Sequence, residues 1–160
     1  MLPVLIRPAE EGDRPFVLAS WADSYLGHAP HIRSWTGPDP ELQREMVRAY
    51  RRRLSHATEV MEILVASHQE DKGVLFGFVA RDFQVDLEIP VMHYIFVKEP
   101  YRGLGIAKRL MEGAGLLYDR LAVTHWTRDC ESYQSNGGRR MDFRPSLFSG
   151  LKKEKRERTT

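Results

Sequence analysis

The chain has 160 residues and a net charge of +2, and 42% of its residues are hydrophobic and 29% are charged. This size and balance are typical of one soluble globular domain and leave little room for a second. The single cysteine, Cys130, excludes a disulfide framework and a cysteine-based metal cluster, and it favours a reducing cytoplasm.

The two ends of the chain limit its location and its domain organisation. No apolar run approaches the ~18 residues of a membrane-spanning helix, and the N-terminus lacks the basic region of a signal peptide, so we expect a cytoplasmic protein that uses no membrane and no metal. Residues 151–160 carry five Lys or Arg against two Glu and only one apolar residue. We predict one domain over residues 1–150 and a disordered tail over residues 151–160, which stays solvated or contacts an acidic partner.

The first predicted elements are a strand and a helix. The β-branched and aliphatic residues 4–6 predict a strand that Pro8 ends. Asp13 is suited to be the N-cap of the helix that follows, because Pro15 then falls in the first turn, where its missing N–H costs least. Apolar residues recur at helical spacing until Gly27, which ends this helix.

A loop separates this helix from a second one. Residues 28–40 contain three prolines, so we predict a loop there. The pair Asp39-Pro40 supplies an N-cap and a first helical residue. The second helix then places its apolar side chains on one face, namely Leu42, Met46, Val47, Tyr50 and Leu54.

Three strands follow in succession. Residues 59–67 and 74–81 predict strands joined by a polar turn, and residues 82–88 form a weaker extended segment. Residues 91–97 are the most β-branched and aromatic run of the chain. Short connections between these strands favour antiparallel pairing.

The last third of the chain alternates between helices and strands. Residues 104–117 predict a helix, residues 121–127 a strand and residues 130–135 a short helix. Residues 141–148 predict a final strand, which Pro145 confines to an edge of the sheet. The apolar stripe of the longer helix comprises Leu104, Ala107, Leu110, Met111 and Ala114.

The element order is therefore β-α-α-β-β-β-α-β-α-β. It predicts an α/β fold (α+β mixed sheet) of about six or seven strands, mostly antiparallel, with helices on both faces. A β-α-β crossover is expected from residues 91–97 through the helix at 104–117 to residues 121–127.

Residues 95–111 carry the most informative motif, a buried strand followed by a turn with two glycines and a helix. Glycine allows a ligand to approach the backbone closely, and the first turn of a helix presents unpaired N–H groups and a positive dipole end. Together these features favour phosphate binding, to which Lys108 and Arg109 add positive charge. The alternative is that Gly103 and Gly105 only relieve crowding. The glycine spacing fits neither a P-loop nor a dinucleotide fingerprint.

This motif resembles the signature of the GNAT superfamily of N-acetyltransferases, Gln/Arg-x-x-Gly-x-Gly/Ala. Arg102, Gly105 and Ala107 occupy its fixed positions, and residues 6–9, Ile-Arg-Pro-Ala, with Asp13 resemble the family's first strand and helix. The element order is similar over nearly the whole chain, roughly residues 5–148. The resemblance implies a GNAT-like fold, and acetyl-CoA as co-substrate.

The resemblance also implies where acetyl-CoA binds. The pantetheine arm would pair with the strand at Ile95, Phe96 and Val97, in a gap between that strand and the one at 121–127. A backbone N–H near Phe96 or Val97 would stabilise the oxyanion. The pyrophosphate would lie on the turn that comprises Arg102, Gly103, Leu104, Gly105, Ile106, Ala107 and Lys108.

The catalytic residues are assigned by the same resemblance. Tyr133, four residues before Gly137, is the candidate acid for the departing thiolate; the alternative is that it packs on the sheet. Glu88 and His93 are the candidate bases, with a surface carboxylate and a hydrogen-bonded core histidine as their alternatives. The loop at 28–40 lies where the family shapes its acceptor site.

The expected activity is therefore transfer of the acetyl group from acetyl-CoA to an amine of an unidentified acceptor in a ternary complex, the EC 2.3.1 type of reaction. One alternative is a catalytically weak acyl-CoA-binding module, because an aromatic after Gly137 and an asparagine near Arg128 are missing. Another is a nucleic-acid-modifying enzyme on the same fold, suggested by Arg51–Arg53 and the basic tail. The sequence does not decide whether the protein forms a homodimer.

Overall fold

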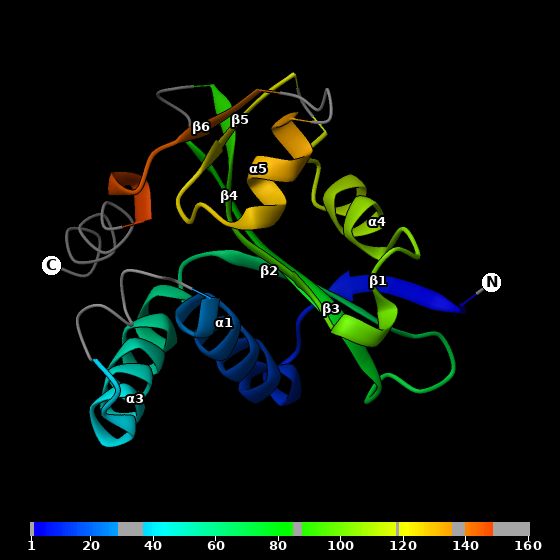
Figure 1. Cartoon of the computed structure of the whole chain (residues 1–160). Coiled ribbons are helices and arrows are strands. Elements are labelled where there is room, and N and C mark those ends of the chain that lie inside the picture. Colours follow the sequence, from blue (N-terminus) through cyan, green and yellow to red (C-terminus); the bar gives the residue numbers. More distant parts are fainter. Residues whose placement is uncertain (1, 29–36, 85–87, 118, 136–139, 149–160) are drawn as a thin grey trace, which may run out of the picture.

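The computed structural model describes residues 2–28, 37–84, 88–117, 119–135 and 140–148 (Figure 1). The predicted tail at 151–160 and residues 29–36 of the predicted loop lie outside these residues. Within the described parts, no helix is long and apolar enough to cross a membrane.

A six-stranded mixed sheet forms the centre of the described structure, in the order β1-β2-β3-β4-β5-β6. The pairs from β1 to β4 are antiparallel, and β4–β5 and β5–β6 are parallel. The mostly antiparallel mixed sheet, the crossover and the edge position of the last strand are thus confirmed. The strands are β1 Val4–Pro8, β2 Glu62–His68, β3 Leu75–Gln84, β4 Ile89–Val97, β5 Arg120–Val123 and β6 Arg140–Phe143.

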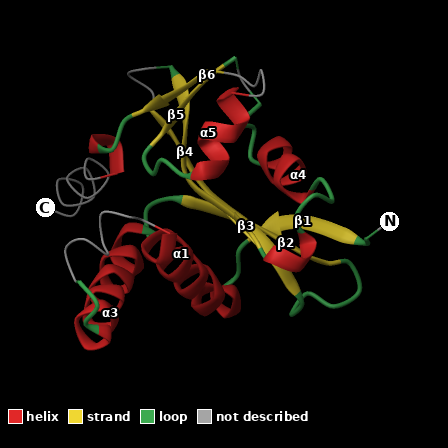
Figure 2. Ribbon diagram, viewed as in Figure 1, coloured by secondary structure: helices red, strands yellow, loops and turns green. Residues whose placement is uncertain are grey.

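Helices cover both faces of this sheet, as expected (Figure 2). The long helices α1 and α3 lie together on one face and the shorter α4 and α5 on the other. Each pair covers its own hydrophobic cluster: Val17, Trp21 and Leu54 belong to the first, and Leu110 and Cys130 to the second. The helices are α1 Arg14–His28, α3 Pro40–Ala57, α4 Ile106–Gly113 and α5 Arg128–Ser135, with 3-10 turns η1 Glu11–Asp13 and η3 Glu99–Tyr101.

Several element ends differ from the prediction, because pairing and packing determine them. Residues 82–84 continue β3 along β4 and are not a separate segment. Strand β5 stops at Val123, four residues early, and α5 starts earlier than predicted, at Arg128. The last strand ends at Phe143, and residues 146–148 after Pro145 are helical.

The N-terminus of α4 also differs. Gly105 is its N-cap, so the helix begins at Ile106 and not at Leu104. Leu104 is 58% exposed and Ala107 is exposed, which removes both from the predicted apolar stripe. Ile106 takes the inner position instead, with Leu110, Met111 and Ala114.

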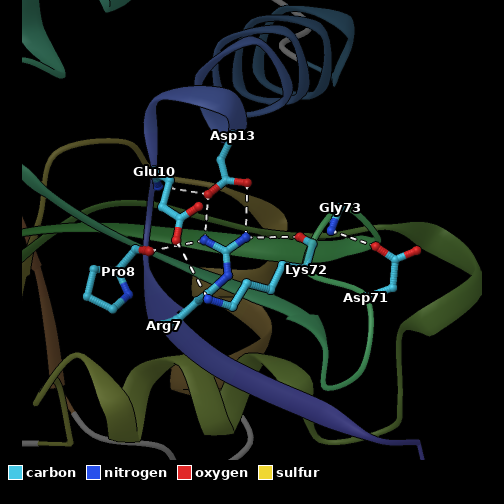
Figure 3. Close-up of polar contacts among 7 residues, drawn as sticks. All are labelled: Arg7, Pro8, Glu10, Asp13, Asp71, Lys72 and Gly73. Atoms are coloured by element: carbon cyan, nitrogen blue, oxygen red, sulfur yellow. Dashed lines mark hydrogen bonds and ion pairs between the residues drawn. The ribbon is translucent and has the colours of Figure 1, made fainter.

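Asp39 caps α3 as predicted, whereas Asp13 has a different role. The Asp39 carboxylate accepts hydrogen bonds from the N–H groups of Glu41 and Leu42. Asp13 lies in η1, where its carboxylate accepts from the Glu10 N–H and from both terminal nitrogens of Arg7, at 2.6 and 3.1 Å (Figure 3).

The buried Arg7–Asp13 pair joins three segments. Arg7 on β1 also donates to the carbonyl of Lys72, in the turn between β2 and β3 (Figure 3). Arg7 and Asp13 are 8% and 6% exposed. The pair therefore fixes the start of α1 to the end of the sheet that carries this turn.

Candidate functional site

The turn between β4 and α4 owes its shape to two glycines. Gly103 and Gly105 have φ angles of 78° and 81°, in the left-handed region that side chains other than glycine rarely adopt. A Cβ atom at either position would meet nothing within 4 Å. The glycines therefore do not relieve crowding within the protein. They set the backbone conformation and leave open space in front of it.

Helix α4 directs its N-terminus into this open space. The first turn of a helix has N–H groups without acceptors in the helix, and no acidic residue lies in the first turn of α4. Arg102 crosses the turn, donating from Nε to the carbonyl of Val97 at 2.9 Å, with its guanidinium 5.9 Å from the Phe96 ring. The Arg109 side chain reaches away from the turn to β1, where it donates to the Val4 carbonyl at 2.7 Å, and Arg109 does not line the pocket.

A pocket of about 700 Å³ begins at this turn and extends between β4, α4 and α5. It is lined by every predicted cofactor residue except Leu104, and by Tyr133. Neither Glu88 nor His93 is among its lining residues. Its walls include Met92, Ile95, Phe96, Val97, Arg102, Gly103, Gly105, Ile106, Ala107, Lys108, Met111, Asp129, Cys130, Tyr133 and Met141.

The pocket lies where β4 and β5 separate. The two strands pair only at Val91 with Ala122 and at Met92 with Val123. Beyond this point β4 continues to Val97 with β3 as its partner on one side. The expected gap between these strands is therefore present, and its β4 edge carries Ile95, Phe96 and Val97.

A β-bulge in β4 determines where His93 lies. Ala80 pairs with Tyr94, and the next residue, Arg81, pairs with Met92, so His93 is the extra residue. The bulge brings Met92 to the pocket, together with Ile95. His93 therefore does not alternate in phase with Ile95, as a regular strand would require.

His93 is buried, at 1% exposed, and it directly follows Met92, the last residue of β4 that pairs with β5. Its Nδ1 lies 3.0 Å from the Thr124 hydroxyl, and its Nε2 has no hydrogen-bond partner among the described residues. Burial, followed by the effect of His125, lowers the pKa of His93 to about 3, so the imidazole is neutral.

The other two predicted catalytic residues lie at different depths. Tyr133, on α5, is half-buried, lines the pocket and packs against the cluster beneath α4. Glu88 is exposed at the start of β4, with a φ of 52°. The structure thus brings Tyr133 and the turn to one pocket, His93 to the adjacent gap, and Glu88 to the surface.

Comparison with known proteins identifies the family. The family model of the acetyltransferase (GNAT) family matches residues 13–114, from the last residue of η1 to the end of α4. The chain belongs to the GNAT acetyltransferase family. No curated protein sequence matches the chain.

Solved structures share the GNAT fold at low sequence identity. A histone acetyltransferase HPA2 and related acetyltransferase from Corynebacterium glutamicum is 16% identical, with a TM-score of 0.58 over 85% of this chain and 84% of that one. A possible acetyltransferase from Clostridium difficile is 13% identical, with a TM-score of 0.54 over 88% and 93%. A ribosomal-protein-alanine N-acetyltransferase from Brucella melitensis is 19% identical, with a TM-score of 0.52 over 88% and 95%.

As a GNAT acetyltransferase, the chain uses acetyl-CoA. The residues of the turn fit a pyrophosphate, because the space that a Cβ of Gly103 or Gly105 would occupy is open. Lys108 and Arg102 supply positive charge at the same end of the pocket. Among the residues that the structure describes, no group of three His, Cys, Asp or Glu could hold a metal ion.

Sequence reasoning missed three polar residues that are connected to His93 by hydrogen bonds, directly or in series. The Thr124 hydroxyl lies 2.9 Å from His125 Nδ1, and His125 Nε2 lies 2.7 Å from the Tyr50 hydroxyl. Burial lowers the pKa of His125 to about 4. No spacing rule connects Tyr50 on α3 with residues 74 and 75 positions later, and α3 reaches the end of β5 only in the folded chain.

Proposed function

We propose that this enzyme transfers the acetyl group directly from acetyl-CoA to an amine of its acceptor, in a ternary complex. The observation that carries the proposal is a single pocket with the glycine turn at one end and Tyr133 on its wall. A bound thioester supplies the activated acetyl group, and the residues of the chain supply position and proton transfer.

The backbone would hold acetyl-CoA at two places. The N–H groups from Gly103 to Lys108 would bind the pyrophosphate, with Arg102 and Lys108 as counter-charges. The edge of β4 at Ile95–Val97 would pair with the amide groups of the pantetheine arm, because β5 leaves this edge uncovered. An N–H near Phe96 or Val97 would stabilise charge on the carbonyl oxygen in the transition state.

Three proton transfers accompany acetyl transfer to an acceptor that enters as an ammonium. The tyrosine hydroxyl is a hydrogen-bond donor, and Tyr133 on the pocket wall would protonate the departing thiolate and then recover a proton from the acetylated nitrogen. We assign removal of the first proton, from the ammonium, to His93 in preference to Glu88. Neither residue lines the pocket, but His93 is buried at the point where β4 and β5 separate, whereas Glu88 is exposed at the surface.

The test is turnover of acetyl-CoA with a panel of primary amines, measured as release of the free thiol. We expect at least one amine to be acetylated in a single step, with no acetylated enzyme trapped by rapid denaturation. Tight binding of coenzyme A without turnover of any amine would refute the proposal and identify the chain as an acyl-CoA-binding module.

A further inference from the structure

A continuous chain of hydrogen bonds connects α3 to the bulge of β4. The Tyr50 hydroxyl lies 2.7 Å from His125 Nε2, His125 Nδ1 lies 2.9 Å from the Thr124 hydroxyl, and that hydroxyl lies 3.0 Å from His93 Nδ1. The groups come from three separate parts of the chain. One end is the buried Nε2 of His93, and the other is the half-buried Tyr50.

The surroundings of this chain are aromatic. The ring of His125 packs edge-on against Trp21, Tyr25 and Phe148, and His93 also packs against Phe148. Thr124 and His125 are 4% and 7% exposed. Burying several polar groups is costly unless each is bonded, and His93 Nε2 has no partner among the described residues.

The chain can hold its protons in two orders. Each neutral imidazole has one N–H and one lone pair, and each hydroxyl can donate one bond and accept another. In the first order His93 donates from Nδ1 to Thr124, Thr124 to His125, and His125 from Nε2 to Tyr50. In this order the lone pair of His93 Nε2 is free to accept a proton. In the second order each hydrogen bond runs the other way: Tyr50 donates to His125, His125 to Thr124, and Thr124 to His93.

We propose that this chain carries the proton of the acceptor ammonium from the β4–β5 gap to solvent. The N–H bond of the ammonium breaks as His93 Nε2 takes the proton, and the Nδ1 proton passes to Thr124. The Thr124 proton passes to His125 Nδ1, the Nε2 proton of His125 passes to Tyr50, and Tyr50 releases its own proton to water. The chain keeps its number of protons and its charge, because one proton enters at His93 and one leaves at Tyr50.

After the product leaves, the chain resets by the reverse transfers. Water in the vacated gap takes the proton from His93 Nε2, and Tyr50 regains one from solvent. No imidazolium accumulates at any stage, which agrees with burial that holds the pKa of His93 and His125 at about 3 and about 4.

Few other titratable groups face the histidines. Tyr25 on α1, Tyr94 on β4 and the Cys130 thiol on α5 contact His125. Burial raises the pKa of Tyr25 and raises that of Tyr94 to about 12, so neither tyrosine is charged near neutral pH. The charged groups that act at longer range are Arg53 on Tyr50 and Asp129 on Tyr94.

The first test needs no acceptor. In Tyr50→Phe the exit hydroxyl is lost, and in Thr124→Val the chain is broken at its centre with little change of shape. We expect the ring ¹⁵N shifts of both His93 and His125 to change in Tyr50→Phe, although three hydrogen bonds separate His93 from Tyr50. The control is Tyr94→Phe, which loses an equally short 2.7 Å bond, to Ser24, outside the chain. Unchanged His93 shifts in Tyr50→Phe would show that the groups are not coupled and would overturn the proposal.

The second test rests on the proposed function and uses an amine that the parent enzyme acetylates. Below the pKa of that amine, Tyr50→Phe and Thr124→Val should lower kcat by about 10²-fold with the KM for acetyl-CoA unchanged. The loss of kcat should shrink as the pH rises above the pKa of the amine, because a neutral amine has no ammonium proton to remove. Tyr94→Phe should show the same dependence of kcat on pH as the parent. Identical pH profiles in parent and Tyr50→Phe would overturn the proposal. Absence of any turnover in the parent would refute acetyl transfer instead, and the ¹⁵N shifts would still decide whether the chain is coupled.

Discussion

Gly105 is the residue on which the cofactor assignment depends most directly. In Gly105→Val a branched side chain would fill the open space before the turn, at a φ of 81°. We expect the affinity for coenzyme A, measured by calorimetry, to fall at least tenfold while the domain still folds. Gly37→Val is the matched control, because Gly37 also has a positive φ, of 58°, and open space at its Cβ.

The two variants separate backbone strain from ligand binding. Each should lose about 1–2 kcal/mol of stability from the left-handed conformation. Only Gly105→Val should lose binding. Equal affinity for coenzyme A in Gly105→Val and the parent would show that the turn is structural.

Tyr133 decides between an enzyme with a positioned acid and one without. Tyr133→Phe removes one hydroxyl and little volume from the pocket wall. With an accepted amine, kcat should fall by about 10²–10⁴-fold, and the KM of the amine should change little. Coenzyme A affinity is the internal reference and should not change. Equal kcat in parent and variant would remove Tyr133 from the mechanism.

At the scale of single residues, local pattern predicted the turn and missed the buried chain. Gly103 and Gly105 were predictable because a strand, two glycines and a helix are adjacent in sequence. The environment of His93 was not, because it depends on a bulge that arises from the pairing of β3 with β4. The contact between Tyr50 and His125 likewise exists only through tertiary packing.

At the scale of elements, the Arg7–Asp13 pair connects β1, η1 and the β2–β3 turn (Figure 3). Removing the charge of Asp13 leaves the Arg7 guanidinium buried without an opposite charge. Asp13→Asn should therefore lower the free energy of unfolding in urea by about 3 kcal/mol. Glu10→Gln is the control, because the Glu10–Lys72 pair is exposed and 3.9 Å long, and it should cost less than about 1 kcal/mol. Equal losses in the two variants would contradict this account.

The same pair predicts a dependence on pH. Burial alone would raise the pKa of Asp13, but hydrogen bonds from Arg7 and the Glu10 N–H, with the charge of Arg7, lower it overall. A carboxylate whose pKa is lower in the folded state than in the unfolded state contributes its full stabilisation of the fold at any pH above its unfolded-state pKa. This contribution is lost as the pH falls through its folded-state pKa. The stability difference between parent and Asp13→Asn should thus be constant from pH 6 to 7 and shrink below about pH 4. A difference that grows in acid would contradict the lowered pKa.

Elements with local stop signals were predicted well, and those ended by tertiary contacts were not. Asp39 and Pro40 set the start of α3 in both sequence and structure. Leu104 was placed in a helix because its spacing fits, but Gly105 in a left-handed conformation prevents α4 from starting before Ile106. The end of β5 at Val123 follows from the separation of β4 and β5, which no local residue signals.

At the scale of the whole molecule, the sheet separates the pocket from the outer end of the proposed proton chain. The helix pair α4 and α5 and the helix pair α1 and α3 lie on opposite faces of the sheet (Figure 2). The pocket is lined by residues of α4 and α5, whereas Tyr50 packs against the cluster beneath α1 and α3. His93 lies at the bulge between them. The order of elements was enough to predict this architecture, whereas the acceptor was not predictable, because acceptor loops vary among proteins of one fold.

The most direct test of the central claim is the binding of coenzyme A to the unmodified chain, measured by titration calorimetry together with thermal unfolding. If the turn before α4 binds the pyrophosphate, the titration should show a single site. Coenzyme A at ~100 times its Kd should then stabilise the fold by about 2.7 kcal/mol and raise the Tm, and the same concentration should stabilise Gly105→Val clearly less. No heat of binding and no Tm shift at millimolar coenzyme A would contradict the account.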